Sequence, residues 1–321
     1  MLNIFTRKFS KKHWDDYSSL QAGVILSPAQ LHILQQILTE MLHNIVDVCE
    51  KNHIPYFLVG GTALGALRHG GFIPWDDDID IAMFRKDYER FLICFEEELK
   101  DKYYIQTPEH TDGYPSLIPR IRSMGTVVRS REDLWTDESH SGAWVDLFVF
   151  ENTFDNSFLR FFHGLLCLGS GGLLACRKVF HMRKKLRPFV IPESAYARKV
   201  LLRSIIGGFF AWLPINWIRK FANNCNRMCK NDQCLMVTAP SGHWRFFGDM
   251  YPRAFFANGR KENFAGMQCQ VPLKVEKSLE HSYGTGQQIP ENAEKERHFF
   301  CAFSLEKAED CAQLRRGDVI K

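Results

Sequence analysis

Residues 56–84 carry the sequence YFLVGGTALGALRHGGFIPWDDDIDIAMF, which decides the fold. Its opening YFLV is typical of a short buried strand, and Gly60 and Gly61 end that strand in a turn. Thr62 is placed to cap a brief helix through Arg68. The closing DIDIAM alternates charged and apolar side chains, which predicts a second strand. A strand, a turn, a helix and a strand therefore surround a dense group of aspartates.

The flanking sequence extends this pattern. Ser27 and Pro28 are typical of a helix start, and apolar residues follow at helical spacing to about residue 52. KDYERFLICFEEEL returns to helical spacing, whereas SLIPRIRSMGTVVR and GAWVDLFVF resemble further strands. This order of elements predicts an α/β (α+β) fold with a mixed sheet flanked by helices.

The character of the sequence changes at residue 151, where long apolar, aromatic and basic stretches begin. The chain of 321 residues is long enough for one large domain or two smaller ones. The predicted segments are an N-terminal extension at 1–26, a catalytic core at 27–150, a mainly helical insertion at 151–245, a closing segment of the catalytic domain at 246–305 and a tail at 306–321.

Composition narrows the protein class. The formal net charge of +4 does not call for a nucleic-acid partner. Ten cysteines without a regular framework favour a reducing compartment, and Cys225, Cys229 and Cys234 lack the spacing of paired zinc knuckles. The N-terminus is a poor signal peptide, and no uncharged apolar run reaches the roughly 20 residues of a spanning helix. We therefore expect a cytoplasmic protein.

The four aspartates at positions 76, 77, 78 and 80 exclude two common motifs. An EF-hand loop would need Gly where Ile81 stands, and a P-loop would need a Gly-Lys-Ser/Thr after one of the glycine pairs. On a strand, Asp78 and Asp80 point to the same face, where two carboxylates repel unless a cation lies between them. Hard carboxylate oxygens suit Mg²⁺ or Mn²⁺.

A third carboxylate follows downstream. Asp146 lies in the otherwise apolar AWVDLFVF, where an unpaired charge would be costly. Placed beside Asp78 and Asp80, it would complete a cluster that holds one or two metal ions. The alternative is that Asp146 ends a strand at the solvent edge and the four aspartates cap a loop. Gly60 and Gly61 would let a phosphate approach the backbone at a helix N-terminus.

At this point the residues match a known family. GGTALGALRHGGFIPWDDDIDIAM strongly resembles the signature of the LicD family of phosphocholine transferases, to which fukutin is more distantly similar. The family carries the nucleotidyltransferase fold, and its motifs correspond here to Gly60-Gly61-Thr62, Asp78-Ile79-Asp80 and Asp146. The C-terminal part also resembles the family's closing element, with Tyr283-Gly284 and His298 in register, although Thr285 replaces the usual Asp and a Pro-Pro pair is reduced to Pro290.

The resemblance implies a metal-dependent phosphotransferase. It would move a phospho-alcohol, typically phosphocholine from CDP-choline, to a hydroxyl of a surface glycan such as lipopolysaccharide or teichoic acid. Asp78, Asp80 and Asp146 would be the catalytic residues and the ligands of Mg²⁺ or Mn²⁺, with Asp146 also orienting or deprotonating the acceptor hydroxyl. The implied phosphate- and nucleotide-binding residues are Gly60, Gly61, Thr62 and Arg68. Asp76 and Asp77 are expected to support the site or cap its loop.

A choline head group requires aromatic rings, because a quaternary ammonium donates no hydrogen bonds and is held by cation–π attraction. Phe72 and Trp75 are the candidates beside the aspartates, and Trp135 and Trp144 are further candidates near Asp146. The alternative for each is an ordinary core aromatic. Arg120 and Arg122 alternate on a predicted strand and are candidates to reach the nucleotide, with solvated arginines as the alternative.

Residues 158–218 combine apolar helices with a basic run. They would either rest peripherally on an anionic membrane that carries a lipid-linked glycan acceptor, or pack as a subdomain over the active site. Two other functions stay open: a nucleotidyltransferase that attaches a nucleotide to a small molecule or protein, and a non-catalytic choline- or glycan-binding protein.

Overall fold

The computed structural model describes residues 23–135, 141–283, 298 and 300–305. The tail, most of the N-terminal extension, and Gly284, Thr285 and Pro290 lie outside the described residues. The helices are α1 (Pro28–Lys51), α2 (Gly60–His69), α3 (Arg85–Leu99), η2 (Arg131–Leu134), α4 (Ser157–Leu186), η4 (Arg187–Phe189), α5 (Ala195–Phe209), α6 (Ile215–Asn226), α7 (Arg245–Gly248), η5 (Arg253–Phe255) and α8 (Val275–Tyr283). The strands are β1 (Phe57–Leu58), β2 (Asp80–Phe84), β3 (Tyr103–Gln106), β4 (Arg120–Ser123), β5 (Val127–Ser130), β6 (Trp144–Asn152), β7 (Met236–Thr238), β8 (Met250–Pro252), β9 (Arg260–Phe264), β10 (Met267–Val271) and β11 (Phe300–Ser304).

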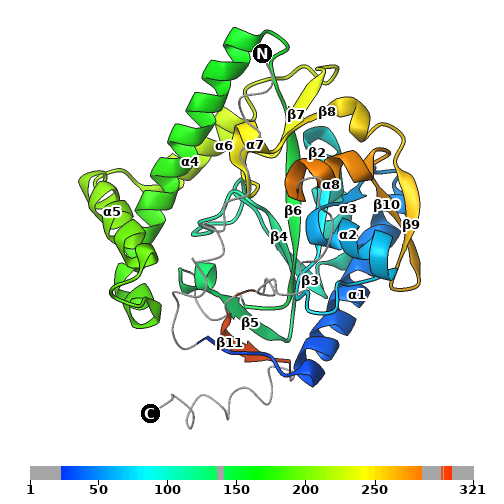
Figure 1. Ribbon diagram of the computed structural model, residues 1–321, viewed down its shortest axis with the longest axis horizontal. Helices are drawn as coiled ribbons and strands as arrows, with labels where there is room; N and C mark the ends of the chain where they lie inside the picture. Colours follow the sequence, from blue (N-terminus) through cyan, green and yellow to red (C-terminus); the bar gives the residue numbers. More distant parts are fainter. Residues whose placement is uncertain (1–22, 136–140, 284–297, 299, 306–321) are drawn as a thin grey trace.

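A seven-stranded sheet forms the centre of the molecule. Its strand order is β1-β2-β6-β4-β3, with β7 beside β6 and β8 beside β7. β2 and β6 run parallel, and the other neighbours are antiparallel. In Figure 1, α1, α2 and α3 lie on one side of β6 and the layer of α4, α5 and α6 lies on the other. The predicted α/β fold with a mixed sheet flanked by helices is confirmed.

The local signals for α1 act as predicted. The Ser27 hydroxyl accepts from the backbone of Gln30, the Gln30 side chain accepts from the backbone of Ser27, and Pro28 occupies the first turn. The apolar positions of the helix, such as Leu34 and Leu42, are buried against the sheet. α1 therefore covers the face of the sheet that lies away from α4, α5 and α6.

Several elements differ from the expected ones. β2 begins at Asp80, so Asp78 lies in the loop before the strand. The stretch SLIPRIRSMGTVVR forms two strands, β4 and β5, and β5 pairs with β11 in a separate two-stranded sheet. β3 was not predicted, because the four residues of Tyr103–Gln106 have neither alternation nor an apolar run. Between residues 151 and 245, β7 returns to the main sheet after the helices.

The long helix α4 also departs from expectation. Together with η4 it spans Ser157–Phe189, 33 residues, with an 18-residue window of mean hydropathy 1.4 of which 28% is buried. It is therefore long and apolar enough to cross a membrane. The sequence expectation of no spanning segment required an uncharged run, whereas this helix includes charged residues. Length and composition alone do not establish a span, because the core helix of a globular protein passes the same test.

Candidate metal and phosphate site

Three carboxylates converge where β2 and β6 lie side by side. Asp80 and Asp146 are direct partners in the parallel register of the two strands. Asp78 reaches the same point from the loop before β2, and one carboxylate oxygen from each of Asp78, Asp80 and Asp146 lies within 4.8 Å of the others. The structure therefore brings together the three aspartates that the sequence singled out.

The carboxylates of Asp76, Asp78 and Asp80 lie close to one another, and the pKa of each is raised. Burial, followed by the charge of Asp78, raises the pKa of Asp76 to about 9. Burial also raises the pKa of Asp78, and it raises that of Asp80 well above its ordinary value. One oxygen of Asp76 is buried without a hydrogen-bond partner. Because a divalent cation would offset this repulsion, and carboxylate oxygens are the ligands that Mg²⁺ and Mn²⁺ prefer, these residues fit such an ion.

Asp146 is held in place by two buried neighbours. Arg120 donates through Nε to its Oδ1 at 2.6 Å, and the indole Nε1 of Trp144 donates to its Oδ2 at 3.2 Å. The guanidinium of Arg120 also lies 4.8 Å from the ring centre of Trp144, and that of Arg122 lies 5.1 Å from it. Neither arginine is solvated: Arg122 is fully buried and donates to Gln106 and the Gly142 carbonyl. Arg120 thus positions a predicted metal ligand.

The diglycine turn lies directly against the aspartates. Gly60 has a φ of +57°, and a Cβ there would lie 3.1 Å from Oδ2 of Asp80. A Cβ on Gly61 would lie 3.1 Å from Oδ2 of Asp76. The absence of side chains therefore lets the first turn of α2 approach the carboxylates. The first amides of that helix lie at this corner, and no side chain of the described residues caps them.

Thr62 does not cap the helix as expected, because α2 already begins at Gly60. Its buried hydroxyl instead accepts a hydrogen bond from the backbone N–H of Asp80 at 2.9 Å. Thr62 thus fixes the start of β2, which carries one of the three aspartates. A sequence pattern cannot tell a hydroxyl that caps its own helix from one that accepts from a neighbouring strand.

Arg68 lies at the other end of α2. It is exposed in the last turn of the helix, whereas the diglycine forms the first turn. Among the described residues no hydrogen bond or ion pair joins Arg68 to the aspartates. Its role toward a phosphate stays a prediction.

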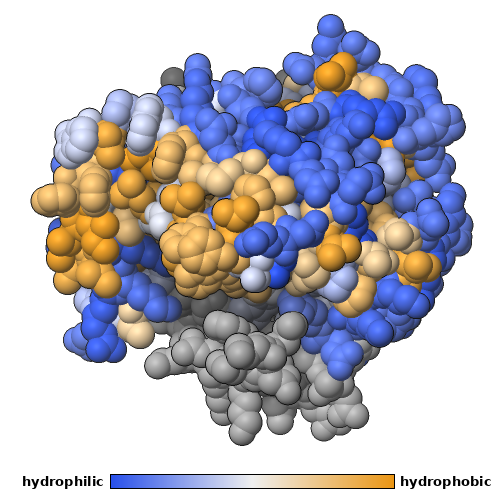
Figure 2. Space-filling view, turned by 90° about the horizontal axis from the view of Figure 1, so that it is seen from above, coloured by the Kyte–Doolittle hydropathy of each residue, from blue (hydrophilic) through white to orange (hydrophobic). Residues whose placement is uncertain are grey.

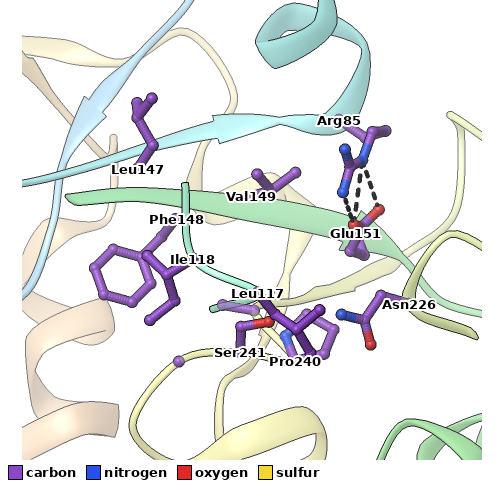
Figure 3. A pocket seen from close by; sticks show the side chains of 12 residues that line it. Arg85, Leu117, Ile118, Leu147, Phe148, Val149, Glu151, Asn226, Pro240 and Ser241 are labelled. Carbon is purple, nitrogen blue, oxygen red and sulfur yellow. Dashed lines mark hydrogen bonds and ion pairs between the residues drawn. The ribbon is translucent and has the colours of Figure 1, made fainter. Parts of the chain in front are cut away.

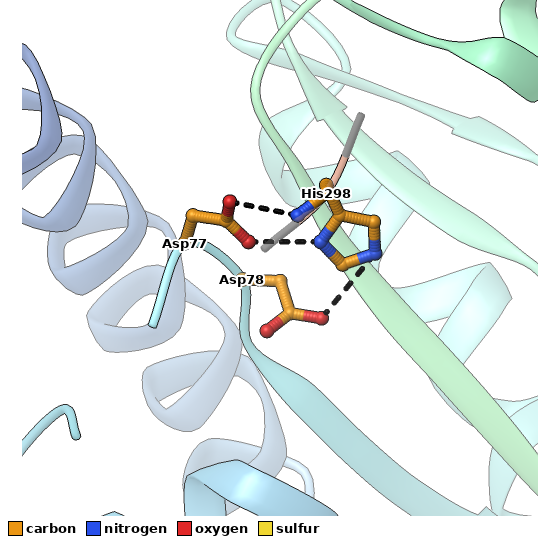
Figure 4. A group of neighbouring side chains, drawn as sticks. All are labelled: Asp77, Asp78 and His298. Carbon is orange, nitrogen blue, oxygen red and sulfur yellow. Dashed lines mark hydrogen bonds and ion pairs between the residues drawn. The ribbon is translucent and has the colours of Figure 1, made fainter. Parts of the chain in front are cut away.

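Sequence reasoning underestimated Asp77 and His298. Asp77 is buried. Its Oδ2 accepts from the backbone N–H of His298 and its Oδ1 pairs with Nδ1 of the same histidine, each at 2.9 Å (Figure 4). Nε2 of the same imidazole lies 3.8 Å from Asp78. Asp77, Asp78 and His298 therefore form a second group able to hold a cation, beside the first. The sequence feature that pointed to His298 was its match to the closing element of the family.

The aromatic candidates are placed differently from one another. The ring of Phe72 packs edge-on against Phe264 with centroids 5.0 Å apart and joins the core, which supports the core-aromatic alternative. Trp75 is half-buried next to Asp76. Trp144 has its ring covered by Arg120 and Arg122, so it offers no free face to a choline.

A small pocket lies along β6 (Figure 3). Phe148 lines it and lies two residues after Asp146, on the same face of the strand. Ser241 and Asn226 line its other side, and the ion pair of Arg85 and Glu151 closes one end. The hollow therefore lies between β6 and the loop residues at 117–118 and 239–242, and no sequence motif predicted it.

Comparisons with known proteins agree with this geometry. Residues 53–160 match the family model described as LicD/FKTN/FKRP, nucleotidyltransferase domain. The chain is 26% identical to the "Lipopolysaccharide cholinephosphotransferase LicD" of Haemophilus influenzae over 269 residues, 79% of this chain and 92% of that protein. It is 44% identical to the "Ribitol 5-phosphate transferase FKRP" of Homo sapiens over 50 residues, 16% of this chain and 10% of that protein.

Both named relatives are transferases of a phosphorylated alcohol by their printed names, so the predicted class of phosphotransferase enzyme is confirmed. The matched segment, residues 53–160, contains the diglycine, the three converging aspartates and Arg120. Residues 53–160 therefore match the LicD/FKTN/FKRP nucleotidyltransferase domain, and the chain is similar over most of its length to a LicD transferase.

Proposed function

We propose that this chain transfers phosphocholine from CDP-choline, or another phospho-alcohol from its CDP derivative, to a hydroxyl of a cell-surface glycan. The observation that carries the proposal is the convergence of Asp78, Asp80 and Asp146 inside the matched domain. The likeness over most of the chain to a lipopolysaccharide cholinephosphotransferase favours phosphocholine and a lipopolysaccharide acceptor, with teichoic acid as a second candidate acceptor.

The roles follow from the geometry. Asp78, Asp80 and Asp146 would hold Mg²⁺ or Mn²⁺, which supplies positive charge to the donor diphosphate and the departing CMP. Gly60 and Gly61 leave room for a phosphate beside the first amides of α2, with Arg68 as a further phosphate ligand. Thr62 keeps Asp80 in position through its backbone. Asp146, already accepting from Arg120 and Trp144, would orient the acceptor hydroxyl.

We place the acceptor beside Phe148, because this residue lies two positions after Asp146 on the same face of β6. Trp75 remains the candidate for an aromatic contact to choline, and Phe72 is a weaker one since its ring packs in the core. We place the protein in the cytoplasm, peripheral to the inner face of the membrane where a lipid-linked acceptor would lie.

The test is a donor panel. Purified protein is incubated with CDP-choline, CDP-ribitol or CDP-glycerol, Mg²⁺ or Mn²⁺, and candidate glycans, and released CMP and the modified glycan are measured. We expect CMP release with one donor. Asp80→Asn and Asp146→Asn should each lower the rate at least about a thousandfold, since both lose a charge that the metal site needs. Asp101→Asn, at an exposed position in the turn after α3, is the matched control.

The product separates the alternatives. A nucleotide attached to the acceptor without CMP release would identify a nucleotidyltransferase instead. Binding of choline or glycan with full affinity and no turnover of any donor would indicate a binding protein. Full activity of Asp80→Asn would refute the assigned metal site.

A further inference from the structure

The helix α5 presents an apolar face to solvent. Leu201, Ile205 and Phe209 are exposed at a spacing of four residues, which places them on one face of the helix. Phe209 is 76% exposed and the following Trp212 is 74% exposed. The opposite face packs on α4, where a Cβ added at Gly207 would lie 2.2 Å from the Cys176 carbonyl. The exposed face therefore belongs to a firmly packed helix.

The first half of α4 continues this face. Phe158, Phe161 and Phe162 are all exposed, and Trp217 and Phe221 of α6 stack in parallel at 5.4 Å while both remain exposed. Figure 2 shows hydrophobic residues gathered over the side of the molecule where α4 and α5 lie. Single exposed apolar residues are ordinary, but a gathering of this extent marks an interaction surface.

The charge around this face is almost all of one sign. Residues 157–228 contain 13 lysines and arginines and one acidic residue, Glu193, although the whole chain has 41 basic and 37 acidic residues. On α5, Arg198 is exposed on the same face as Leu201 and Ile205, and Arg203 is exposed farther round the helix. Apolar residues with a basic border are complementary to a lipid surface that carries negative head groups.

We propose that this face, formed by α4, α5 and α6, docks on an anionic lipid bilayer. Exposed Trp212 and Trp217 suit such an interface, because an indole has an apolar body and one polar N–H. A second copy of the chain fits less well, since two identical basic borders would face each other across the contact. The inference rests on exposure and charge, independently of the donor and acceptor proposed above.

The contacts of α4 favour a position on the bilayer over a crossing of it. The ring of buried His163 bonds the Cys225 carbonyl of α6 at 2.8 Å. Buried Arg177 donates to the Gly207 carbonyl at 3.4 Å and to the Leu213 carbonyl at 3.2 Å. A span would strip these partners from α4 and leave a histidine and an arginine in hydrocarbon. Only the outward face of the layer would therefore enter the head-group region.

The experiment is flotation of the full chain with vesicles of phosphatidylcholine, with or without phosphatidylglycerol. We expect co-flotation at low ionic strength with the anionic vesicles, at least about tenfold less with phosphatidylcholine alone, and release at high salt. Phe209→Glu/Trp212→Glu should lower the bound fraction at least about tenfold. Arg198→Gln/Arg203→Gln should lower it about fivefold for each charge removed, on anionic vesicles only.

The matched control is Ile25→Glu/Ile93→Glu, which alters two exposed apolar residues outside the layer, at 85% and 62% exposure. It should float like the parent, with circular dichroism confirming that all variants are folded. The proposal is overturned by any of three results: no flotation with anionic vesicles, equal flotation of Phe209→Glu/Trp212→Glu, or resistance to alkaline carbonate extraction. A dimer that Phe209→Glu/Trp212→Glu dissociates would also overturn it. Transferase turnover is not read in this assay, so its outcome is separate from that of the donor panel.

Discussion

Asp249 is a buried carboxylate outside the aspartate cluster. Its Oδ2 accepts from the backbone N–H of Trp244 at 2.7 Å, and its Oδ1 accepts from the Tyr251 hydroxyl at 3.3 Å. Burial raises the pKa of Asp249 to about 7 in spite of these donors. The folded protein therefore binds a proton here between about pH 4 and pH 7, whereas the unfolded chain has released it.

Stability should consequently fall as the pH rises through this window. A folded-state pKa above the unfolded value gives stability that is present below the unfolded pKa and lost as pH rises to the folded pKa. In Asp249→Asn the carboxamide keeps both contacts without titrating. Denaturant unfolding at pH 5 and pH 8, at fixed Mg²⁺, should show a decrease on the order of 3 kcal/mol in the parent that the variant lacks. The exposed Asp101→Asn variant should behave like the parent. If Asp249→Asn loses as much stability between pH 5 and pH 8 as the parent does, the assignment is wrong.

At this scale the sequence identified the converging aspartates better than the residues that contact them. Asp78, Asp80 and Asp146 stood out because carboxylates are costly in apolar surroundings. Arg120 could not be paired with Asp146 in advance, since their contact depends on which strand lies beside β6 and in which register. The same holds for Asp77 and His298, which are 221 residues apart in sequence.

The contact between α4 and α5 depends on glycine. A Cβ at Gly207 would lie 2.2 Å from the backbone oxygen of Cys176, whereas a Cβ at Gly169 would meet nothing within 4 Å. A backbone carbonyl cannot move aside as readily as the end of a flexible side chain can. Position 207 therefore has no room for a side chain, whereas position 169 does, although both glycines lie within helices.

Substitutions at these positions should change stability in opposite directions. Gly207→Ala should lower the free energy of unfolding by about 1–3 kcal/mol through overpacking. Gly169→Ala should raise it by up to about 1 kcal/mol, because alanine favours the helix and fills open space. Thermal and denaturant unfolding measure both. Equal and same-signed shifts would contradict the close approach of the two helices.

Among the elements, α1 was predictable because its caps and its apolar spacing are local signals. β2 was predicted two residues too early, because the alternation of DIDIAM begins before the ladder does. β7 gave no signal, since three residues become a strand only through pairing with the end of β6. Local patterns thus located the long elements, and pairing determined the short ones.

Across the whole molecule, a line of charges joins the helical layer to the catalytic core. Lys178 of α4 lies 3.6 Å from Glu132, which lies 3.8 Å from Arg120, which in turn holds Asp146 at 2.6 Å. Lys178 is the largest cause of the lowered pKa of Glu132. The layer is therefore coupled electrostatically to a predicted metal ligand.

Removing the charge of Lys178 should change the activity that depends on Asp146. In Lys178→Met, Glu132 loses its main cation and competes with Asp146 for Arg120. We expect a two- to tenfold lower kcat, roughly 0.4–1.4 kcal/mol, and weaker activation by Mn²⁺. Lys178→Arg should restore most of both, and Lys184→Met, exposed on the same helix, should have no effect. Parent-like metal activation in Lys178→Met would show that the layer and the site are independent.

The composition predicted the helical nature of this layer, but not how it faces the sheet. Specific polar contacts join it to the core, such as those of Lys178 with Glu132 and of Arg219 with the Thr111 carbonyl. Such long-range polar pairs leave no periodic trace in a sequence. Hydrophobic spacing marks a helix face, and tertiary packing decides which part of that face stays exposed.

The pairing of His298 with Asp77 also sets an order of events during synthesis. A ribosome must add 221 residues after the aspartate before the imidazole exists. At about 5–20 residues per second this takes roughly 10 to 45 seconds. By then Asp78, Asp80 and Asp146 have already been synthesised. The acidic part of this corner is therefore complete in sequence well before the imidazole that contacts Asp77 and Asp78.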